Sequence, residues 1–260
     1  ACKFQILWTC FNEYVNPFFP FLGYGVGNAS ALNSFRHFAR FMNPAYEPLP
    51  SSVIAEGDDI WITDPKGREH RLAMLRNQTR GQDNLSLADF IAPKGDWIGC
   101  FAVTAGIGLK ELCEKFRAGG DDYNAIMAKL LADRLTEAFA EAVHSFVRRQ
   151  MWGYETGEAP TPRQVIRGEY RGRRMAFGYP ASPDHSLKRE VFDLLAAELT
   201  TGMKLTENYM VDPGEALCGL LLADADYFSV GTVDTEQLLD YARRRGLDVE
   251  LVKKLIPHNI

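Results

Sequence analysis

Three closely spaced arginines mark the part of the chain whose residue types best fit binding of a small ligand. Arg171, Arg173 and Arg174 lie in the segment 168–186, which reads GEYRGRRMAFGYPASPDHS. An arginine guanidinium binds a carboxylate or a phosphate through two parallel hydrogen bonds. Glycine lets a ligand approach the backbone closely, and proline fixes the turns that follow. The segment therefore predicts a rigid loop for an anionic or zwitterionic ligand; the alternative is a basic surface loop whose arginines meet only solvent.

Residues 174–185, RMAFGYPASPDH, closely resemble the RPAPGYPACPDH-type signature of the activation domain of cobalamin-dependent methionine synthase. Other stretches resemble the same family in the same order: LADFIAPK (87–94), FAVTAG (101–106), DDYN (121–124), ADRLTEAFAE (132–141), WGY (152–154), TGMKLTE (201–207) and DYARRRG (240–246). The resemblance runs from about residue 52 to the end of the chain. It implies an activation-type domain over residues 51–260, preceded by a divergent segment at residues 1–50.

The resemblance implies that the chain binds S-adenosylmethionine. Arg174 stands at the position of the family's carboxylate-binding arginine. The other cofactor-binding positions that the resemblance implies are Met175, Ala176 and Gly178, through their backbones, and the aromatic pair Tyr227 and Phe228.

Glu137 has two interpretations. It corresponds to a family glutamate near the substrate pocket and the docked corrin, which implies a catalytic role in electrostatics or positioning. It also follows Asp133 by four residues on a predicted helix, as Glu141 follows Glu137, and such a stripe is usually a solvated face.

Several positions depart from the family pattern. The family motif with the aspartate that binds the ligand's amino group is matched only weakly here, by the segment YVNPFF. Asn16 lies near the position of that aspartate. Ser182 replaces a cysteine and Arg173 replaces an aliphatic residue. The acidic residue before the Tyr-x-Gly stretch falls on Gly168, with Glu169 next to it. Substrate positioning is therefore less well specified than substrate binding.

The function that the resemblance implies is reductive methylation of a cobalamin carried by a partner domain or subunit, in methionine biosynthesis. Flavodoxin or a flavoprotein reductase supplies the electron in the family. Because cobalt is the nucleophile, the chain needs none of its own and is expected to be inactive alone. The rival interpretation is a non-catalytic docking module that keeps the fold and has little affinity for S-adenosylmethionine.

Composition narrows the class of protein. The 260 residues are 46% hydrophobic and 24% charged, as in an ordinary globular protein, and the net charge of −5 argues against nucleic-acid binding. The five cysteines are scattered without CxxC pairs, which fits reduced thiols and a cytoplasmic location. No apolar stretch approaches the length needed to cross a membrane. We expect no metal site, because cysteine and histidine do not cluster.

Two further motifs are weak. The stretch 104–110, TAGIGLK, lacks the third glycine of a dinucleotide-binding loop and predicts a plain turn from strand to helix. No GxSxG sequence occurs, so a nucleophilic hydrolase is not supported. His185 is interpreted as a cap or a hydrogen-bonded loop histidine, and His144 as a surface residue.

The spacing of apolar residues predicts one α+β domain with a mainly antiparallel twisted sheet and flanking helices. A long helix over 122–151 carries an apolar stripe that includes Tyr123, Ile126 and Leu130. Ser182 and Pro183 predict the start of a helix over 186–198. The other expected elements are a hairpin over 53–75, a short helix or loop at 86–93, and strands over 97–104, 216–222 and 227–233. Two more helices are expected over 235–245 and 249–255, and the first of them is predicted to start with an Asp234–Gln237 capping box.

Overall fold

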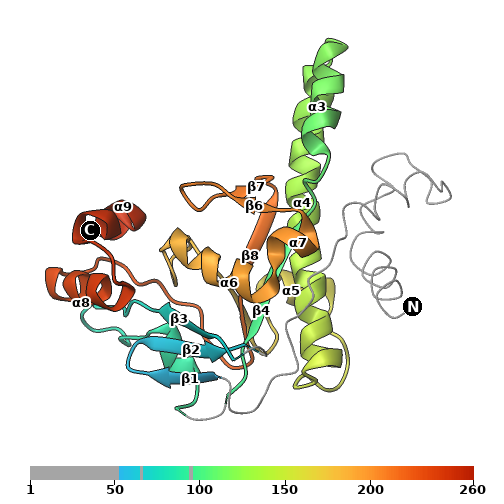
Figure 1. Ribbon diagram of the computed structural model, residues 1–260. Helices are drawn as coiled ribbons and strands as arrows, with labels where there is room; N and C mark the ends of the chain where they lie inside the picture. Colours follow the sequence, from blue (N-terminus) through green and yellow to red (C-terminus); the bar gives the residue numbers. More distant parts are fainter. Residues whose placement is uncertain (1–52, 65–66, 94–95) are drawn as a thin grey trace. The chain divides into compact units, whose positions relative to one another are not determined.

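A computed structural model describes residues 53–64, 67–93 and 96–260 (Figure 1). These residues form two compact units, and each unit is assembled from segments that are separated along the chain. One unit contains residues 101–153 and 196–217; the other contains residues 53–64, 67–93, 96–100, 154–195 and 218–260. Helices occur together with antiparallel strand pairs, which confirms the predicted α+β class.

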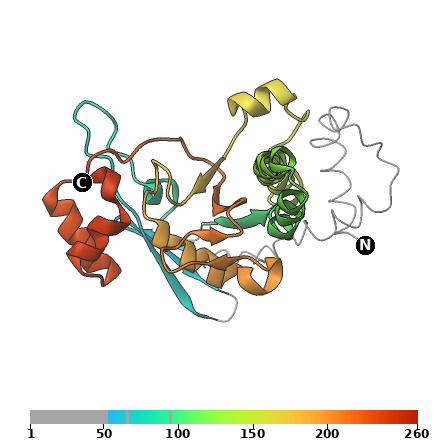
Figure 2. The same ribbon diagram turned by 90° about the horizontal axis from the view of Figure 1, so that it is seen from above.

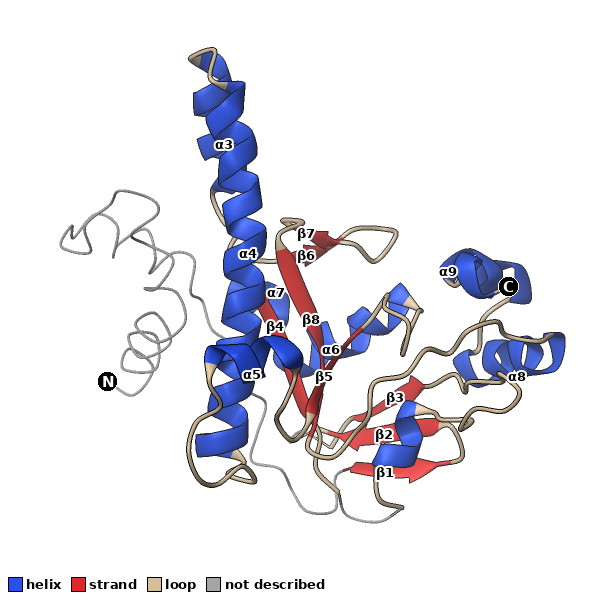
Figure 3. Cartoon of the chain, turned by 180° about the vertical axis from the view of Figure 1, so that it is seen from behind, coloured by secondary structure: helices blue, strands red, loops and turns tan. Residues whose placement is uncertain are grey.

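The second unit begins with a three-stranded antiparallel sheet in the order β1-β2-β3 (Figure 3). Its strands are β1 (Val53–Glu56), β2 (Asp59–Thr63) and β3 (Glu69–Ala73). Side chains alternate between faces: Ile60 pairs with Leu72 and both are buried, whereas Trp61 pairs with Arg71, whose guanidinium lies 5.1 Å from the indole centre. The predicted hairpin is therefore confirmed as β2 and β3, and β1 is a further strand that pairs with β2.

Two C-terminal helices complete the core of this unit. They are α8 (Thr235–Arg245) and α9 (Val249–Leu255). Asp234 caps α8 by accepting a hydrogen bond from the Gln237 amide, and Gly246, with φ 64°, ends it. The Gln237 side chain binds the backbone N–H and C=O of Arg76, so it does not complete the predicted capping box. The shared core includes Ala73, Leu75, Val230, Leu238, Tyr241 and Val252.

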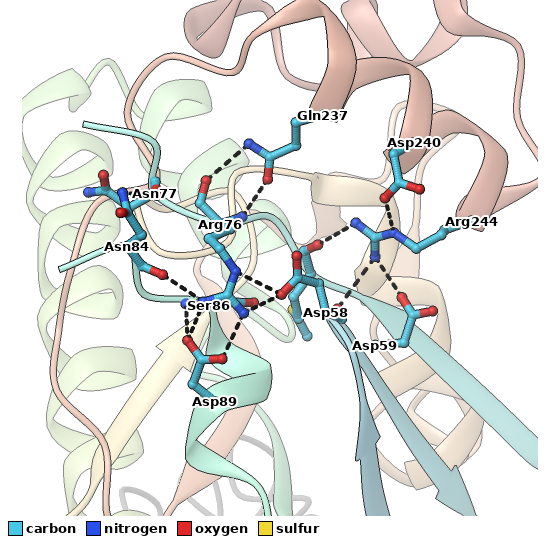
Figure 4. Close-up of polar contacts among 11 residues, drawn as sticks. Asp58, Asp59, Arg76, Asn77, Asn84, Ser86, Asp89, Gln237, Asp240 and Arg244 are labelled. Atoms are coloured by element: carbon cyan, nitrogen blue, oxygen red, sulfur yellow. Dashed lines mark hydrogen bonds and ion pairs between the residues drawn. The ribbon is translucent and has the colours of Figure 1, made fainter. Parts of the chain in front are cut away.

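Two arginines of this unit each lie between two carboxylates (Figure 4). The pairs are Arg76 with Asp58 and Asp89, and Arg244 with Asp59 and Asp240. The hydrogen bonds from Arg76 hold the pKa of Asp89 below its usual value. The ion pairs thus connect β2, the 3₁₀ turn at Leu87–Phe90 and α8.

The lowered pKa of Asp89 predicts a pH-dependent contribution to stability. The contribution is present above the carboxylate's ordinary pKa and is lost as pH falls through the lower folded value. Because Asp89 is partly exposed, we expect Asp89→Asn to cost only about 0.5–1 kcal/mol at pH 7. Urea unfolding should show this difference at pH 7 and nearly none at pH 3. Asp83→Asn, on an exposed neighbouring position, is the control, and an equal effect of Asp89→Asn at both pH values would contradict the assignment.

A second sheet has the order β4-β8-β5. Its strands are β4 (Gly99–Thr104), β5 (Arg173–Ala176) and β8 (Ala216–Leu222). A side chain at Gly219 would put its Cβ 2.1 Å from the carbonyl oxygen of Met175, so glycine is required for β5 and β8 to pair this closely. The strands predicted at 97–104 and 216–222 are confirmed.

The first unit contains two helices that run side by side, α3 (Leu109–Ala118) and α4 (Asp122–Phe146) (Figures 1 and 2). Gly108, with φ 83°, makes the predicted turn into α3, and Asp121 caps α4. The chain continues from α4 as one π-helical turn over Val147–Met151. The contact between α3 and α4 is built from small or medium side chains: Leu109, Cys113, Ala125 and Ala132.

The predicted apolar stripe of α4 is wrong in its first turns. Tyr123, Ile126 and Leu130 are exposed, because α4 packs on α3 through alanines that allow close approach. The prediction for His144 is also wrong, since its ring is fully buried and lies 2.9 Å from Nη1 of the buried Arg148. Hydrophobic periodicity identifies a helix and does not by itself identify which face is covered.

The helix predicted at 186–198 is shorter and broken. The structure has a 3₁₀ turn at His185–Leu187, then α6 (Lys188–Leu195), and a separate α7 (Ala197–Thr201). Ala196, with φ 47°, separates the two helices. The remaining elements are α5 (Pro162–Arg167), the short hairpin β6 (Lys204–Leu205) and β7 (Val211–Asp212), and a 3₁₀ turn at Pro257–Asn259.

Candidate ligand-binding site

Strand β5 positions the arginine that the sequence singles out. Met175 is buried, and because side chains alternate along a strand, Arg174 and Ala176 lie on the opposite face, where both are partly exposed. The backbone pairing of Arg174 with Leu221 of β8 fixes this register. Arg174 is thus held on a rigid strand with its side chain on the less buried face.

The two neighbouring arginines have other roles. Arg173 donates to the carbonyl oxygens of Tyr170 and Gly172, both at 2.8 Å, and so closes the turn before β5. Arg171 is exposed, lies 3.4 Å from a carboxylate oxygen of Asp224, and has its guanidinium 5.6 Å from the ring centre of Tyr154. The three arginines therefore do not act as one basic cluster.

Strand β5 leads into a tight turn. We call the strand and this turn together, residues 173–182, the β5 loop. The Gly178 amide donates to the Ser182 carbonyl at 2.8 Å, and the Ser182 amide donates to the Tyr179 carbonyl at 2.9 Å. Gly178 has φ 89°, which favours glycine, and an added Cβ would lie 2.1 Å from Cε1 of His185. The turn is fixed by its own backbone before any ligand arrives.

A second segment, residues 227–230, lies against this loop. The Val230 amide donates to the Pro180 carbonyl at 2.8 Å. Partial burial raises the pKa of Tyr227, and the charge of Tyr179 adds to this change. Tyr179 is 48% exposed and Tyr227 is 55% exposed, so both present accessible aromatic rings. Aromatic rings attract cations and stack on flat groups.

Phe228 faces inward. It packs against the hydrophobic core of its unit, and its ring centre lies 6.4 Å from that of Phe90 in a tilted arrangement. The strand predicted at 227–233 is wrong, because this segment is held by single hydrogen bonds such as that from Val233 to the carbonyl of Asn259, and not by a strand ladder. Phe228 therefore anchors the segment that presents Tyr227.

A buried carboxylate anchors the end of the loop. Asp184 is 1% exposed, and it accepts hydrogen bonds from the Ser186 amide and from the Tyr241 hydroxyl, both at 2.7 Å. Burial and the Asp184 charge raise the pKa of Tyr241 well above its ordinary value, so its hydroxyl remains a donor. The cap of the following 3₁₀ turn is Asp184 and not the predicted Ser182–Pro183 pair, because only the carboxylate reaches the Ser186 amide.

Six of the residues discussed for the ligand belong to one compact unit: Arg174, Met175, Ala176, Gly178, Tyr227 and Phe228. Glu137 belongs to the other unit, where its side chain is exposed on α4. The region containing Asn16 lies outside the described residues. Tyr179 was absent from the predicted site residues, although its place between Gly178 and Pro180 in the motif could have indicated an exposed ring at a turn.

No group of three or more histidine, cysteine, aspartate or glutamate side chains within the described ranges could hold a metal ion. Among the same residues, no helix is both long enough and apolar enough to span a membrane.

The chain thus has an α+β fold in which the β5 loop and the segment 227–230 carry a partly exposed arginine, a fixed turn and two accessible tyrosine rings. The chain belongs to the family described as vitamin B12 dependent methionine synthase, activation domain, which matches residues 49–246. It is also similar to a crystal structure of the MetH reactivation domain bound to AdoHcy. The two share 36% sequence identity with a TM-score of 0.78, over 98% of this chain and 88% of that chain.

Proposed function

We propose that this chain binds S-adenosylmethionine at the β5 loop and supports reductive methylation of a cobalamin held by another domain or subunit of methionine synthase. The observation that carries the proposal is that Arg174 lies on the partly exposed face of β5, four residues before the fixed Gly178 turn, and that Tyr179 and Tyr227 keep accessible rings. Family membership and the similarity to a reactivation domain bound to AdoHcy, the product of methyl transfer from S-adenosylmethionine, support it.

The residues present fit the chemistry of this ligand. Its carboxylate suits the guanidinium of Arg174, which can form two parallel hydrogen bonds. Its sulfonium and adenine suit aromatic faces such as those of Tyr179 and Tyr227. The Gly178 amide is already bonded to the Ser182 carbonyl, so the backbone contacts proposed here use the Gly178 carbonyl and backbone groups of Met175 and Ala176. The site orients the ligand and excludes competing arrangements.

The proposed reaction takes place in the cytoplasm and involves two partners. A cobalamin-binding domain or subunit supplies the nucleophile after one-electron reduction, and the methyl group passes from the sulfonium to cobalt, leaving S-adenosylhomocysteine. Flavodoxin or a flavoprotein reductase is the proposed electron donor. This chain contributes ligand binding and orientation, so no general base or nucleophile is required of it.

Reconstitution tests the proposal. The chain is mixed with a cobalamin-loaded partner domain, a one-electron reductant and S-adenosylmethionine carrying a labelled methyl group. We expect label to appear on the cobalamin only when all components are present. Steady turnover of S-adenosylmethionine with homocysteine by this chain alone, free of cobalamin, would contradict the proposal. Binding of the partner without methyl transfer would favour a non-catalytic docking module.

Glu137→Gln tests whether the exposed carboxylate on α4 takes part in the reaction. Because the side chain is exposed, the substitution should change the free energy of unfolding by less than about 0.5 kcal/mol. Ligand binding should persist, whereas methyl transfer to the partner's cobalamin should slow, because the family resemblance implies an electrostatic or positioning role for this carboxylate in the reaction. The rate of label transfer is measured beside that of Asp133→Asn, an exposed control one turn earlier. Equal rates for Glu137→Gln and wild type would assign Glu137 to the solvated face.

A further inference from the structure

A histidine packs against the β5 loop, and a buried lysine contacts this histidine. The imidazole of His185 fills the space where a Gly178 side chain would be, with Cε1 2.1 Å and Nε2 2.5 Å from the position of an ideal Cβ. The ring is therefore in van der Waals contact with the Gly178 backbone. Any rotation of the imidazole would displace the turn that presents Tyr179.

Lys188 fixes this ring. Its side chain is 7% exposed, and its Nζ lies 2.6 Å from Nδ1 of His185. An ammonium group can only donate hydrogen bonds. With Lys188 as an ammonium, the contact would use the lone pair of Nδ1 and would place the ring proton of neutral His185 on Nε2.

The groups around this pair keep the imidazole neutral. Burial and the Lys188 charge lower the pKa of His185, while Asp184 opposes the change. Burial also lowers the pKa of Lys188, and the carboxylate of Asp184 opposes that change. The Cys218 thiol has a pKa raised to about 12 by burial, so it is protonated at neutral pH and does not neutralise Lys188.

The geometry points to Lys188 as a positioning residue: its hydrogen bond to His185 fixes the tautomer and orientation of the ring against which Gly178 packs, and thereby the conformation of the β5 loop that receives the ligand. This inference rests on the proposed binding of S-adenosylmethionine. Lys188 acts without touching the ligand. It also keeps a second positive charge off His185, next to a ligand whose net charge at neutral pH is positive.

The tautomer is tested in the free chain by two-bond ¹H–¹⁵N NMR of the histidine rings. The signals of His185 are assigned among the five histidines by comparison with His185→Gln. We expect wild type to show the Nε2–H tautomer from pH 8 to pH 6. In Lys188→Met the ring should lose this fixed tautomer and titrate at higher pH. An Nδ1–H tautomer in wild type, or unchanged signals in Lys188→Met, would overturn the inference.

Ligand affinity as a function of pH tests the consequence. For Lys188→Met, we expect binding of S-adenosylmethionine to weaken about threefold at pH 8 and about tenfold at pH 6, where His185 becomes charged. Wild-type affinity should change less than about twofold over the same range. Arg189→Met is the matched control, because it removes a cation one residue along whose side chain is 39% exposed and paired with Asp193. It should behave as wild type at both pH values.

The outcomes separate the two proposals. Melting temperature should not fall in Lys188→Met, because an apolar side chain of similar length replaces a buried ammonium. Equal, pH-independent affinities of wild type and Lys188→Met would overturn the positioning role alone. Failure of the wild-type chain to bind S-adenosylmethionine would overturn the proposed function, and the positioning role with it.

Discussion

Arg174→Ala should weaken binding of S-adenosylmethionine about fiftyfold, because it removes a charge-assisted pair of hydrogen bonds worth roughly 2–3 kcal/mol. The side chain lies on the partly exposed face of β5, so the strand itself should tolerate alanine. Isothermal titration calorimetry measures the affinity, and circular dichroism checks that the fold is retained.

Arg171→Ala is the matched control for this experiment. Arg171 lies three residues away, is exposed, and interacts with Asp224 and the ring of Tyr154. Exposed ion pairs of this kind contribute little, typically below about 1 kcal/mol. The affinity of Arg171→Ala should therefore stay within about twofold of wild type. Equal affinities of Arg174→Ala and wild type would remove Arg174 from the site.

Gly178→Ala should have the largest effect on the β5 loop. A methyl group at this position would meet the His185 ring at 2.1 Å, and the residue would be held at φ 89°. The backbone strain costs about 1–2 kcal/mol and the steric overlap about 1–3 kcal/mol, so we expect a loss of roughly 2–5 kcal/mol in unfolding free energy. Chemical denaturation measures this loss, and the ligand affinity should fall with it.

A second substitution separates the two causes. His185→Ala removes the ring that the methyl group would strike and leaves the backbone strain in place. The double variant Gly178→Ala/His185→Ala should therefore lose less stability than the sum of the two single variants, by about 1 kcal/mol or more. Strict additivity would show that the imidazole does not limit the space at Gly178. The matched control is Gly168→Ala, whose φ is 65° and whose Cβ would meet no heavy atom within 4 Å.

Local patterns in the sequence predict much of this fold. Alternating residues predict β2, and a continuous apolar, β-prone run predicts β4. Asp121, Asp234 and Gly246 mark helix ends that the structure confirms. These features depend on residues close together in the sequence, which is why they can be recognised without coordinates.

Features that depend on distant contacts were not predicted. The alanine face of α4 that packs on α3 cannot be recognised from amphipathicity, because larger apolar residues are spread around the same helix. Gln237 matches a capping box, yet it binds the backbone of Arg76, which lies 161 residues away in the sequence. The segment 227–233 is predicted to be a strand, but no neighbouring strand is hydrogen-bonded along it. In each case a tertiary contact outweighs a local preference.

For the candidate site, the resemblance identified residues that the structure places in one compact unit. It did not identify the different contacts of the three arginines, since only the structure shows that Arg173 donates hydrogen bonds to the carbonyls of Tyr170 and Gly172. Nor did it identify the contact of Lys188 with His185, because an i, i+3 pair across the 3₁₀ turn before α6 has no distinctive pattern in the sequence.

Titration of the wild-type chain with a small series of ligands tests the central claim most directly. The account predicts saturable one-to-one binding of S-adenosylmethionine and of S-adenosylhomocysteine in calorimetry. Decarboxylated S-adenosylmethionine, which lacks only the carboxylate assigned to Arg174, should bind about fiftyfold more weakly. Equal affinities for S-adenosylmethionine and its decarboxylated form, or no saturable binding of S-adenosylmethionine at all, would contradict the account.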